Sequence, residues 1–203
     1  MNHYTIRAAA ALAALLLTVA GCATKPKVER IGVEEVRDVS GRWNDTDSRL
    51  VSEEMVRDVL SRPWLTEFMT RKGKRPAVIV GDIRNLSHEH INVGTFIGDI
   101  ERELINSGRV DFVASRVERG SVREERADQD VHAREDTRKA MGQEIGADFM
   151  LSGTINTIVD AAGKEAVVYY QVDLTLIDML DNRKVWVGQK KIKKAIERPR
   201  FRP

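Results

Sequence analysis

The sequence of 203 residues contains a single cysteine, Cys22. One cysteine cannot form an intramolecular disulfide or a zinc site built from several thiolates. Aromatic residues are also scarce, at 5% of the chain, and proline occurs only five times. The fold must therefore be stabilised by the packing of aliphatic side chains and by hydrogen bonds, because covalent cross-links are excluded.

The chain also lacks an excess of charge of either sign. It has 33 Lys and Arg against 31 Asp and Glu, a formal net charge of +2. This balance argues against a nucleic-acid-binding protein, because such proteins carry a marked excess of positive charge. The apolar run Ala8–Ala20 has about 13 residues, fewer than the roughly 20 that a membrane-spanning helix needs.

The apolar run lies between Arg7 and a lipobox-like sequence that ends in Ala20, Gly21 and Cys22. A positive charge, a short apolar segment and small residues before a cleavage site are typical of a secretory signal peptide. Glycine directly before cysteine indicates the lipoprotein type, so we predict a signal peptide over residues 1–21 and acylation of Cys22. The alternative is an ordinary signal peptide that is cut near Ala20. The residue after Cys22 is Ala23 rather than aspartate, which favours the outer membrane as the destination of the protein.

Residues 22–45 show no sustained period and are interpreted as the lipidated N-terminus and a tether. The valine-rich part, Ile31–Val39, is an alternative edge strand. Residues 46–203 are interpreted as one globular domain with a basic C-terminal tail, because their length suits a single core.

Helical spacing of apolar residues begins after Asp45, Thr46 and Asp47, which offer N-cap side chains. Pro63 ends this helix or begins a second one. A third helix is predicted to end at Gly108 as its C′ residue. The charged segment 115–139 is predicted to be a solvated helix frayed near Gly120, followed by a better packed helix that Gly146 closes.

Strands are predicted where β-branched residues gather. Ala77–Ile83 has the continuous apolar character of a buried strand, and Val110–Ala114 follows the third helix as a short strand. The last third alternates with period two, with strands before and after a turn at Asp160–Lys164 and a final strand from Val185. We expect an α/β fold: a mixed sheet with one parallel β-α-β crossover, helices packed on it and a C-terminal antiparallel meander.

The segment His88-Glu89-His90 follows the buried strand, where α/β sheets bind ligands. As a metal site it lacks a third ligand, so a polar loop in which Asn85 and Glu89 satisfy the local backbone is the favoured interpretation. The sequence contains no glycine-rich nucleotide motif and no Gly-x-Ser-x-Gly elbow. It offers no nucleophile that can be paired with a base. We therefore predict neither an enzyme nor a cofactor.

The final strand carries a cluster of lysines. They are Lys190, Lys191, Lys193 and Lys194. Lysines on an edge strand prevent edge-to-edge aggregation, and they can equally contact an acidic partner.

Six motifs, in one order along the chain, resemble the LpoB-type lipoprotein activators of penicillin-binding proteins. They are Arg62–Leu65, Lys74–Gly81, Asn85–Ile91, Leu104–Gly108, Gly146–Gly153 and Val185–Gly188. The resemblance implies a domain similar to the TolB amino-terminal domain, carried by an outer-membrane lipoprotein. It also implies a partner, a class A penicillin-binding protein, whose peptidoglycan synthesis this non-catalytic protein would stimulate in the periplasm.

Under this hypothesis the contact is expected on exposed loops at one end of the sheet. Asn85, Glu89 and His90 are the first candidates, and the four lysines of the final strand are the second group. An alternative is an envelope secretion or assembly lipoprotein related to curli-type secretion components. The core of those components is similar to the α/β core expected here, but they add long amphipathic strands to it. A lipoprotein hydrolase is a third alternative.

Overall fold

The computed structural model describes residues 28–197, which divide into two compact units between Glu35 and Val36. The described part of the first unit contains a turn in which the Glu35 amide donates to the Gly32 carbonyl. The described residues before Asp45 form no strand, so the alternative of an edge strand over Ile31–Val39 is wrong.

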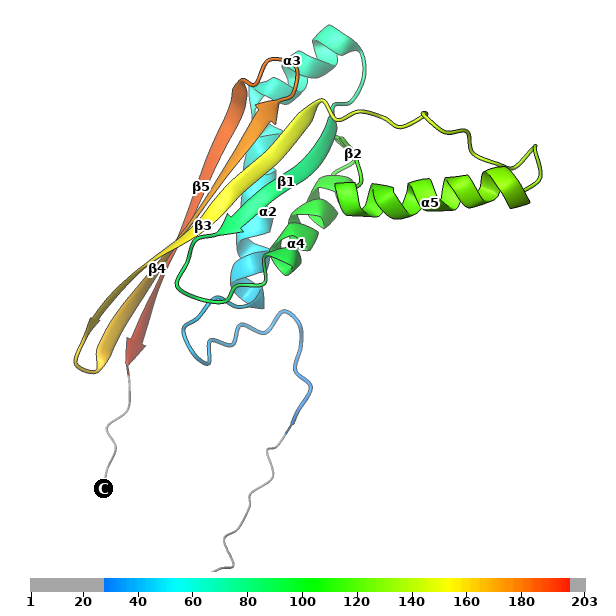
Figure 1. The fold of residues 1–203 in the computed structure, drawn as a ribbon. Coiled ribbons are helices and arrows are strands. Elements are labelled where there is room, and N and C mark those ends of the chain that lie inside the picture. Colours follow the sequence, from blue (N-terminus) through cyan, green and yellow to red (C-terminus); the bar gives the residue numbers. More distant parts are fainter. Residues whose placement is uncertain (1–27, 198–203) are drawn as a thin grey trace, which may run out of the picture. The chain divides into compact units, whose positions relative to one another are not determined.

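The second unit contains four helices and five strands among its described residues (Figure 1). The helices are α2 (Asp45–Ser61), α3 (Pro63–Lys72), α4 (Val93–Asn106) and α5 (Arg116–His132). The strands are β1 (Ala77–Asn85), β2 (Asp111–Phe112), β3 (Phe149–Ala162), β4 (Glu165–Asp178) and β5 (Lys184–Glu197).

The five strands form one mixed sheet in the order β2-β1-β3-β4-β5. β1 is parallel to β2, to which α4 connects it, and parallel to β3. β3, β4 and β5 are antiparallel neighbours. The predicted α/β fold, with a parallel β-α-β unit followed by an antiparallel meander, is confirmed.

The core lies between one face of the sheet and the helices α2, α3 and α4 (Figure 1). Phe96 and Ile100 of α4 and Val51 of α2 are fully buried. Complete burial of an aliphatic or aromatic side chain of this size contributes about 1.5–3 kcal/mol. On β4 every second residue faces this core, as the period of two predicts; these residues are Val168, Tyr170, Val172, Leu174 and Leu176.

No helix of residues 28–197 packs against the other face of the sheet, which we call the open face (Figure 1). It presents the intervening residues of the strands, among them Ile158, Tyr169 and Lys193, which are register neighbours on β3, β4 and β5. Ile158 is 66% exposed. The open face is therefore accessible to a partner.

Asn44 is the N-cap of α2, so the prediction that residues 45–47 supply the cap is wrong. The Asn44 side chain accepts from the Asp47 amide at 3.1 Å. In return, the Asp47 carboxylate accepts from the Asn44 amide at 3.0 Å. This reciprocal capping box satisfies two amides at the start of the helix.

The region after Ala114 differs from the prediction in two ways. α5 runs without a break through Gly120, and residues 133–148 form no helix, so the predicted second helix that Gly146 closes is wrong. Met141 and Ile145 remain exposed, at 55% and 65%, and Gly142 has a φ of 77°. An apolar face that packs against nothing does not stabilise a helix.

The predicted turn at Asp160–Lys164 is too long. Asp160, Ala161 and Ala162 continue β3 and pair with β4. The reversal takes place at Gly163, whose φ of 61° lies in the left-handed region that glycine adopts without strain, and at Lys164. The β3-β4 hairpin is consequently longer than predicted.

Candidate partner-binding surfaces

Residues 38–44, which we call the strap, precede α2 and pack on the domain. The Trp43 ring lies edge-on to Phe96 and to Tyr170, with centroid distances of 6.0 and 5.6 Å. The Tyr170 hydroxyl donates to the Gly41 carbonyl at 3.4 Å. The strap, although it lies within the segment expected to be a tether, thus contributes to the core.

The carboxylate of Glu89 joins the strap to the sheet. It accepts from the Tyr170 hydroxyl at 2.7 Å and from the Trp43 amide at 3.1 Å. Burial and the hydrogen bond to Glu89 raise the pKa of Tyr170 well above its usual range. The tyrosine therefore stays protonated as a donor, and Glu89 connects the strap to the sheet.

The neighbours of Glu89 in the loop after β1 have separate roles. The Asn85 side-chain Nδ2 donates to the Glu89 backbone carbonyl at 2.8 Å, and the Asn85 Oδ1 accepts from the Ser87 backbone amide at 2.9 Å. His88 Nδ1 lies 3.1 Å from the Thr157 hydroxyl. His90 is exposed and borders a cavity of about 350 Å³ beside Trp43. Of the three predicted loop contacts, His90 is exposed and Asn85 and Glu89 are half-buried. Their contact with a partner stays a prediction.

Residues 28–197 include no group of three His, Cys, Asp or Glu side chains that could hold a metal ion. His88 and His90 are separated in their surroundings, one beside Thr157 and the other beside the cavity next to Trp43. The two imidazoles therefore lie in different surroundings, one beside Thr157 and one at the cavity.

Two of the four lysines on β5 face the helices. Lys190 is paired with Glu54 of α2. Lys194 is 10% exposed and its ammonium group donates to Asp47 at 2.6 Å and to Asp38 at 2.7 Å. Burial disfavours the charge, but these hydrogen bonds prevail and raise the pKa of Lys194. Lys190 and Lys194 hold the edge strand against α2 and the strap.

Lys191 and Lys193 point to the open face, because side chains alternate along a strand. Both are exposed and lie opposite Gln171 and Tyr169 of β4. These two lysines are the exposed members of the predicted group, and their contact with a partner stays a prediction.

The structure brings the loop after β1 and the lysine strand to one end of the sheet. The strap links them, because Trp43 bonds to Glu89 while the Arg42 carbonyl accepts from Lys194 at 3.1 Å. The period of two predicts that Tyr170 shares a strand face with its apolar neighbours, but it does not predict the hydrogen bond of its hydroxyl to Glu89. A tryptophan alone in a polar segment was the one signal that the strap packs on the domain.

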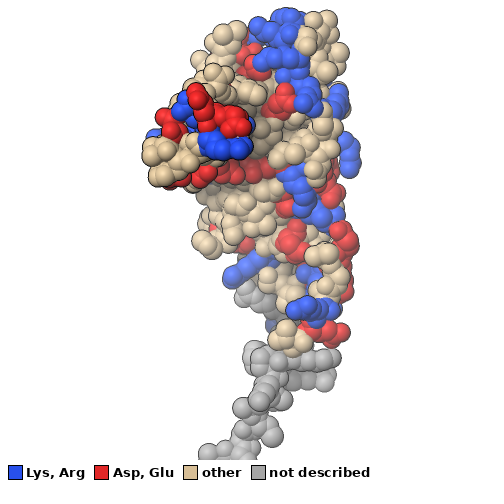
Figure 2. Space-filling model, turned by 90° about the vertical axis from the view of Figure 1, so that its right-hand side faces the viewer, with Lys and Arg blue, Asp and Glu red and all other residues tan. Residues whose placement is uncertain are grey.

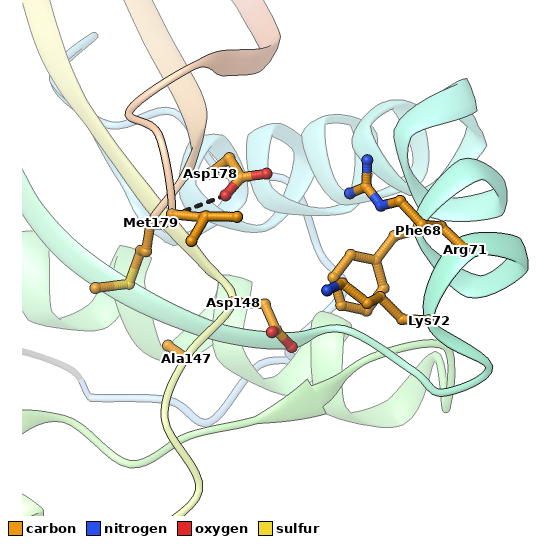
Figure 3. A pocket seen from close by; sticks show the side chains of 8 residues that line it. Phe68, Arg71, Lys72, Ala147, Asp148, Asp178 and Met179 are labelled. Atoms are coloured by element: carbon orange, nitrogen blue, oxygen red, sulfur yellow. Dashed lines mark hydrogen bonds between the residues drawn. The ribbon is translucent and has the colours of Figure 1, made fainter.

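Figure 3 shows a cavity of about 300 Å³ at the other end of the sheet. Arg71 and Lys72 of α3 lie across it from Asp148 and Asp178. The Asp148 carboxylate accepts from the Ala77 amide at 2.9 Å, and Asp178 accepts from the Leu180 amide at 2.9 Å. Both carboxylates thus fix the strand ends, so this cavity is a junction of α3 with two loops.

The surface charges in Figure 2 alternate in sign, with Lys and Arg interspersed among Asp and Glu. This face therefore carries no field of one sign that would attract a polyanion. None of the helices within residues 28–197 is long and apolar enough to cross a membrane. Cys22, the predicted site of acylation, lies outside the described residues.

The family model described as peptidoglycan-synthase activator LpoB matches residues 47–192, which is more than half of the chain. The chain belongs to the LpoB family. The resemblance that the six motifs predicted is thereby confirmed. The members of this family are envelope lipoproteins. They are regulators of peptidoglycan synthases rather than enzymes themselves, and this agrees with a regulatory role for this chain.

Solved structures similar to this LpoB-family chain include three that come from two bacterial proteins. The NMR structure of Escherichia coli LpoB is 13% identical, with a TM-score of 0.37, and the match covers 89% of this chain and 85% of that one. The C-terminal domain of the same protein matches with 13% identity and a TM-score of 0.33, over 65% of this chain and 94% of that one. Lipoprotein GNA1162 from Neisseria meningitidis matches with 16% identity and a TM-score of 0.37, over 59% and 83%.

A search of curated proteins found no match to the chain. The family assignment therefore rests on the family model.

Proposed function

We propose that this chain is a non-catalytic, lipid-anchored regulator of the outer membrane that binds a class A penicillin-binding protein in the periplasm and stimulates its peptidoglycan synthesis. The observation that carries the proposal is the match of the activator family over residues 47–192. The lipobox at Cys22 supports the anchor, and Ala23 supports the outer membrane as its location.

The reach of the domain is set by the chain between Cys22 and Asp38, because the strap is bound to the sheet from Asp38 onward. Sixteen residues, fully extended, span at most about 55 Å. The partner must therefore present its docking region within about this distance of the outer membrane. A synthase held farther away would be out of contact.

We place the contact at the end of the sheet where the loop after β1 approaches the lysine strand. His90, Lys191 and Lys193 are exposed there. Asn85, Glu89, Lys190 and Lys194 bond within the domain, so they position this surface. An acidic patch on the synthase would complement the two lysines and accelerate association.

The proposal is tested by measuring association of the full-length protein, in detergent, with a purified class A penicillin-binding protein of the same organism. Wild type should bind. The double variant Lys191→Glu and Lys193→Glu should associate more slowly and with a weaker salt dependence. Lys184→Glu, an exposed position at the start of the same strand, is the matched control and should bind as wild type does.

Two results have different meanings. Absence of binding by wild type to every class A synthase of the organism would refute the proposed function. Binding that is equally fast for the double variant and wild type would refute only the contact surface. Both variants should retain their stability within about 0.5 kcal/mol, because the changed side chains are exposed.

A further inference from the structure

A cavity of about 300 Å³ lies at the opposite edge of the sheet from β5, between β2, the first half of α5 and residues 143–145. We call it the α5 groove. Its apolar wall is formed by Phe112, Val113, Val122 and Ile145. It is separate from the surface proposed above for the synthase.

The backbone along the groove belongs to an edge strand. The Asp111 amide donates to the carbonyl of Pro76, which directly precedes β1, at 2.9 Å. The Val113 amide donates to the carbonyl of Val78, in β1, at 2.8 Å. Backbone groups of successive residues in a strand point to opposite sides, so the N–H and C=O of Phe112 point away from β1. β2 is the outermost of the strands in residues 28–197, and these residues supply no partner strand on this side.

Arginines line the groove on the side of α5. Arg123 binds Glu144 through two hydrogen bonds of 2.8 Å, and Arg126 lies 3.5 Å from the same carboxylate. This contact with Arg123 lowers the pKa of Glu144. Glu144, a carboxylate from residues 133–148, is thus already bound by arginines of α5.

Arg119, one turn before Arg123, also lowers the pKa of Glu144 through its charge but forms no hydrogen bond with that carboxylate. Its Nε atom is enclosed and has no hydrogen-bond acceptor among the described residues. The acidic residue nearest to the strand edge, Asp111, is paired with Arg75 at 2.6 Å. An enclosed guanidinium N–H without an acceptor is costly unless an acceptor arrives from outside.

We propose that the α5 groove binds an extended segment of a partner protein in which an apolar side chain is next to a carboxylate. The segment would add a strand beside β2 and bond to the Phe112 backbone, as edge strands commonly do with peptides. The apolar side chain would enter the cavity beside Val122 and Ile145, and the carboxylate would accept from Arg119.

A peptide fits these features better than a lipid or a free anion does. Only a backbone can use the N–H and C=O that β2 offers, and a free anion leaves the apolar wall exposed.

The test is an NMR titration of the isotope-labelled full-length chain in detergent with the capped pentapeptide VELEV, and with VKLKV as the matched control. VELEV should shift the amide signals of Phe112, Ala114, Val122 and Ile145, and it should bind at least about tenfold more tightly than VKLKV. Arg119→Met should weaken binding of VELEV about tenfold, the loss expected for one charge-assisted hydrogen bond. Arg116→Met, an exposed change on the same helix, should have no effect.

A second variant guards against misfolding of Arg119→Met. Ile145→Glu changes a side chain that is 65% exposed and places a negative charge in the groove, so it should abolish binding of VELEV while the remaining spectrum is preserved. Equal binding of both peptides, shifts confined to other regions, or no effect of Arg119→Met would overturn the proposal. It would also be overturned if inorganic phosphate or phosphatidylglycerol vesicles, but not VELEV, shifted these signals.

Discussion

Replacing Lys194 with methionine should destabilise the domain while leaving its surface almost unchanged. The Lys194 side chain is 10% exposed, and its ammonium group is bound by Asp47, whose side chain is 8% exposed, and by Asp38. Methionine keeps most of the aliphatic stem but leaves the Asp47 carboxylate without its cation. Removal of one partner from a buried ion pair costs about 3–5 kcal/mol.

The loss should lie near the lower limit of this range, at about 3 kcal/mol. Asp47 retains its hydrogen bond from the Asn44 amide, and Asp38 is 46% exposed to water. For a domain of this size, such a loss lowers Tm by roughly 6–12 °C. The strap should loosen at the same time, because Lys194 also bonds to the Arg42 carbonyl.

Thermal unfolding followed by circular dichroism measures the effect, with Lys193→Met as the matched control. Lys193 is the next residue but faces the open side of the sheet, so its replacement should change stability by about 0.5 kcal/mol or less. Equal stability of the two variants would refute the role of Lys194 in the fold. The difference should disappear when Asp38 and Asp47 are both changed to asparagine, because no carboxylate is then left unpaired.

The pH dependence of this difference follows from the raised pKa of Lys194. A lysine whose pKa is higher in the folded state stabilises the fold fully below its unfolded pKa, which is about 10.5. The contribution is lost as the pH rises through the folded pKa. The gap between wild type and Lys194→Met should thus be constant from pH 7 to pH 9 and narrow only above about pH 10.5.

Three further predictions concern the strap, the sheet and the anchor. Trp43→Ala should lower the free energy of unfolding by about 3 kcal/mol, measured by chemical unfolding. Deletion of Val28–Glu35, which lies in a separate unit, should leave the unfolding curve of the domain unchanged. Equal losses of stability would show that the strap does not belong to the core. Gly153→Ala should cost about 2 kcal/mol, since its Cβ would lie 2.2 Å from the Asp173 carbonyl oxygen, and an unchanged Tm would contradict this. Cys22→Ser should abolish the incorporation of labelled fatty acid, and persistent labelling would refute acylation at this residue.

The meander was predictable because its pattern is local. The alternation from Val168 to Leu176 assigns one face of β4 to the core without reference to any other segment. The parallel unit was predictable for a similar reason, since a continuous apolar strand and an amphipathic helix follow one another directly. Residues 133–148 were mispredicted because helical spacing of a few apolar residues says nothing about whether a surface exists for them to pack on.

Two of the candidate contacts, Glu89 and Lys194, bond within the domain. Glu89 and Lys194 are charged residues in polar or basic segments, so the sequence favoured exposure for both. Their partners, Tyr170 and Asp47, are distant in sequence, and such pairs leave no periodic signal. The alternation that separates Lys190 and Lys194 from Lys191 and Lys193 was present in the sequence, but its phase depends on which face of β5 the helix α2 covers.

The central claim is most directly tested by the rate at which a purified class A penicillin-binding protein of the same organism polymerises fluorescent lipid-linked glycan precursor, with and without the full-length chain. The account predicts faster polymerisation in its presence, loss of this stimulation in the folded double variant Lys191→Glu and Lys193→Glu, and no release of fragments when the chain alone is incubated with peptidoglycan. A rate that does not change on addition of the wild-type chain, or cleavage of peptidoglycan by the chain alone, would contradict it.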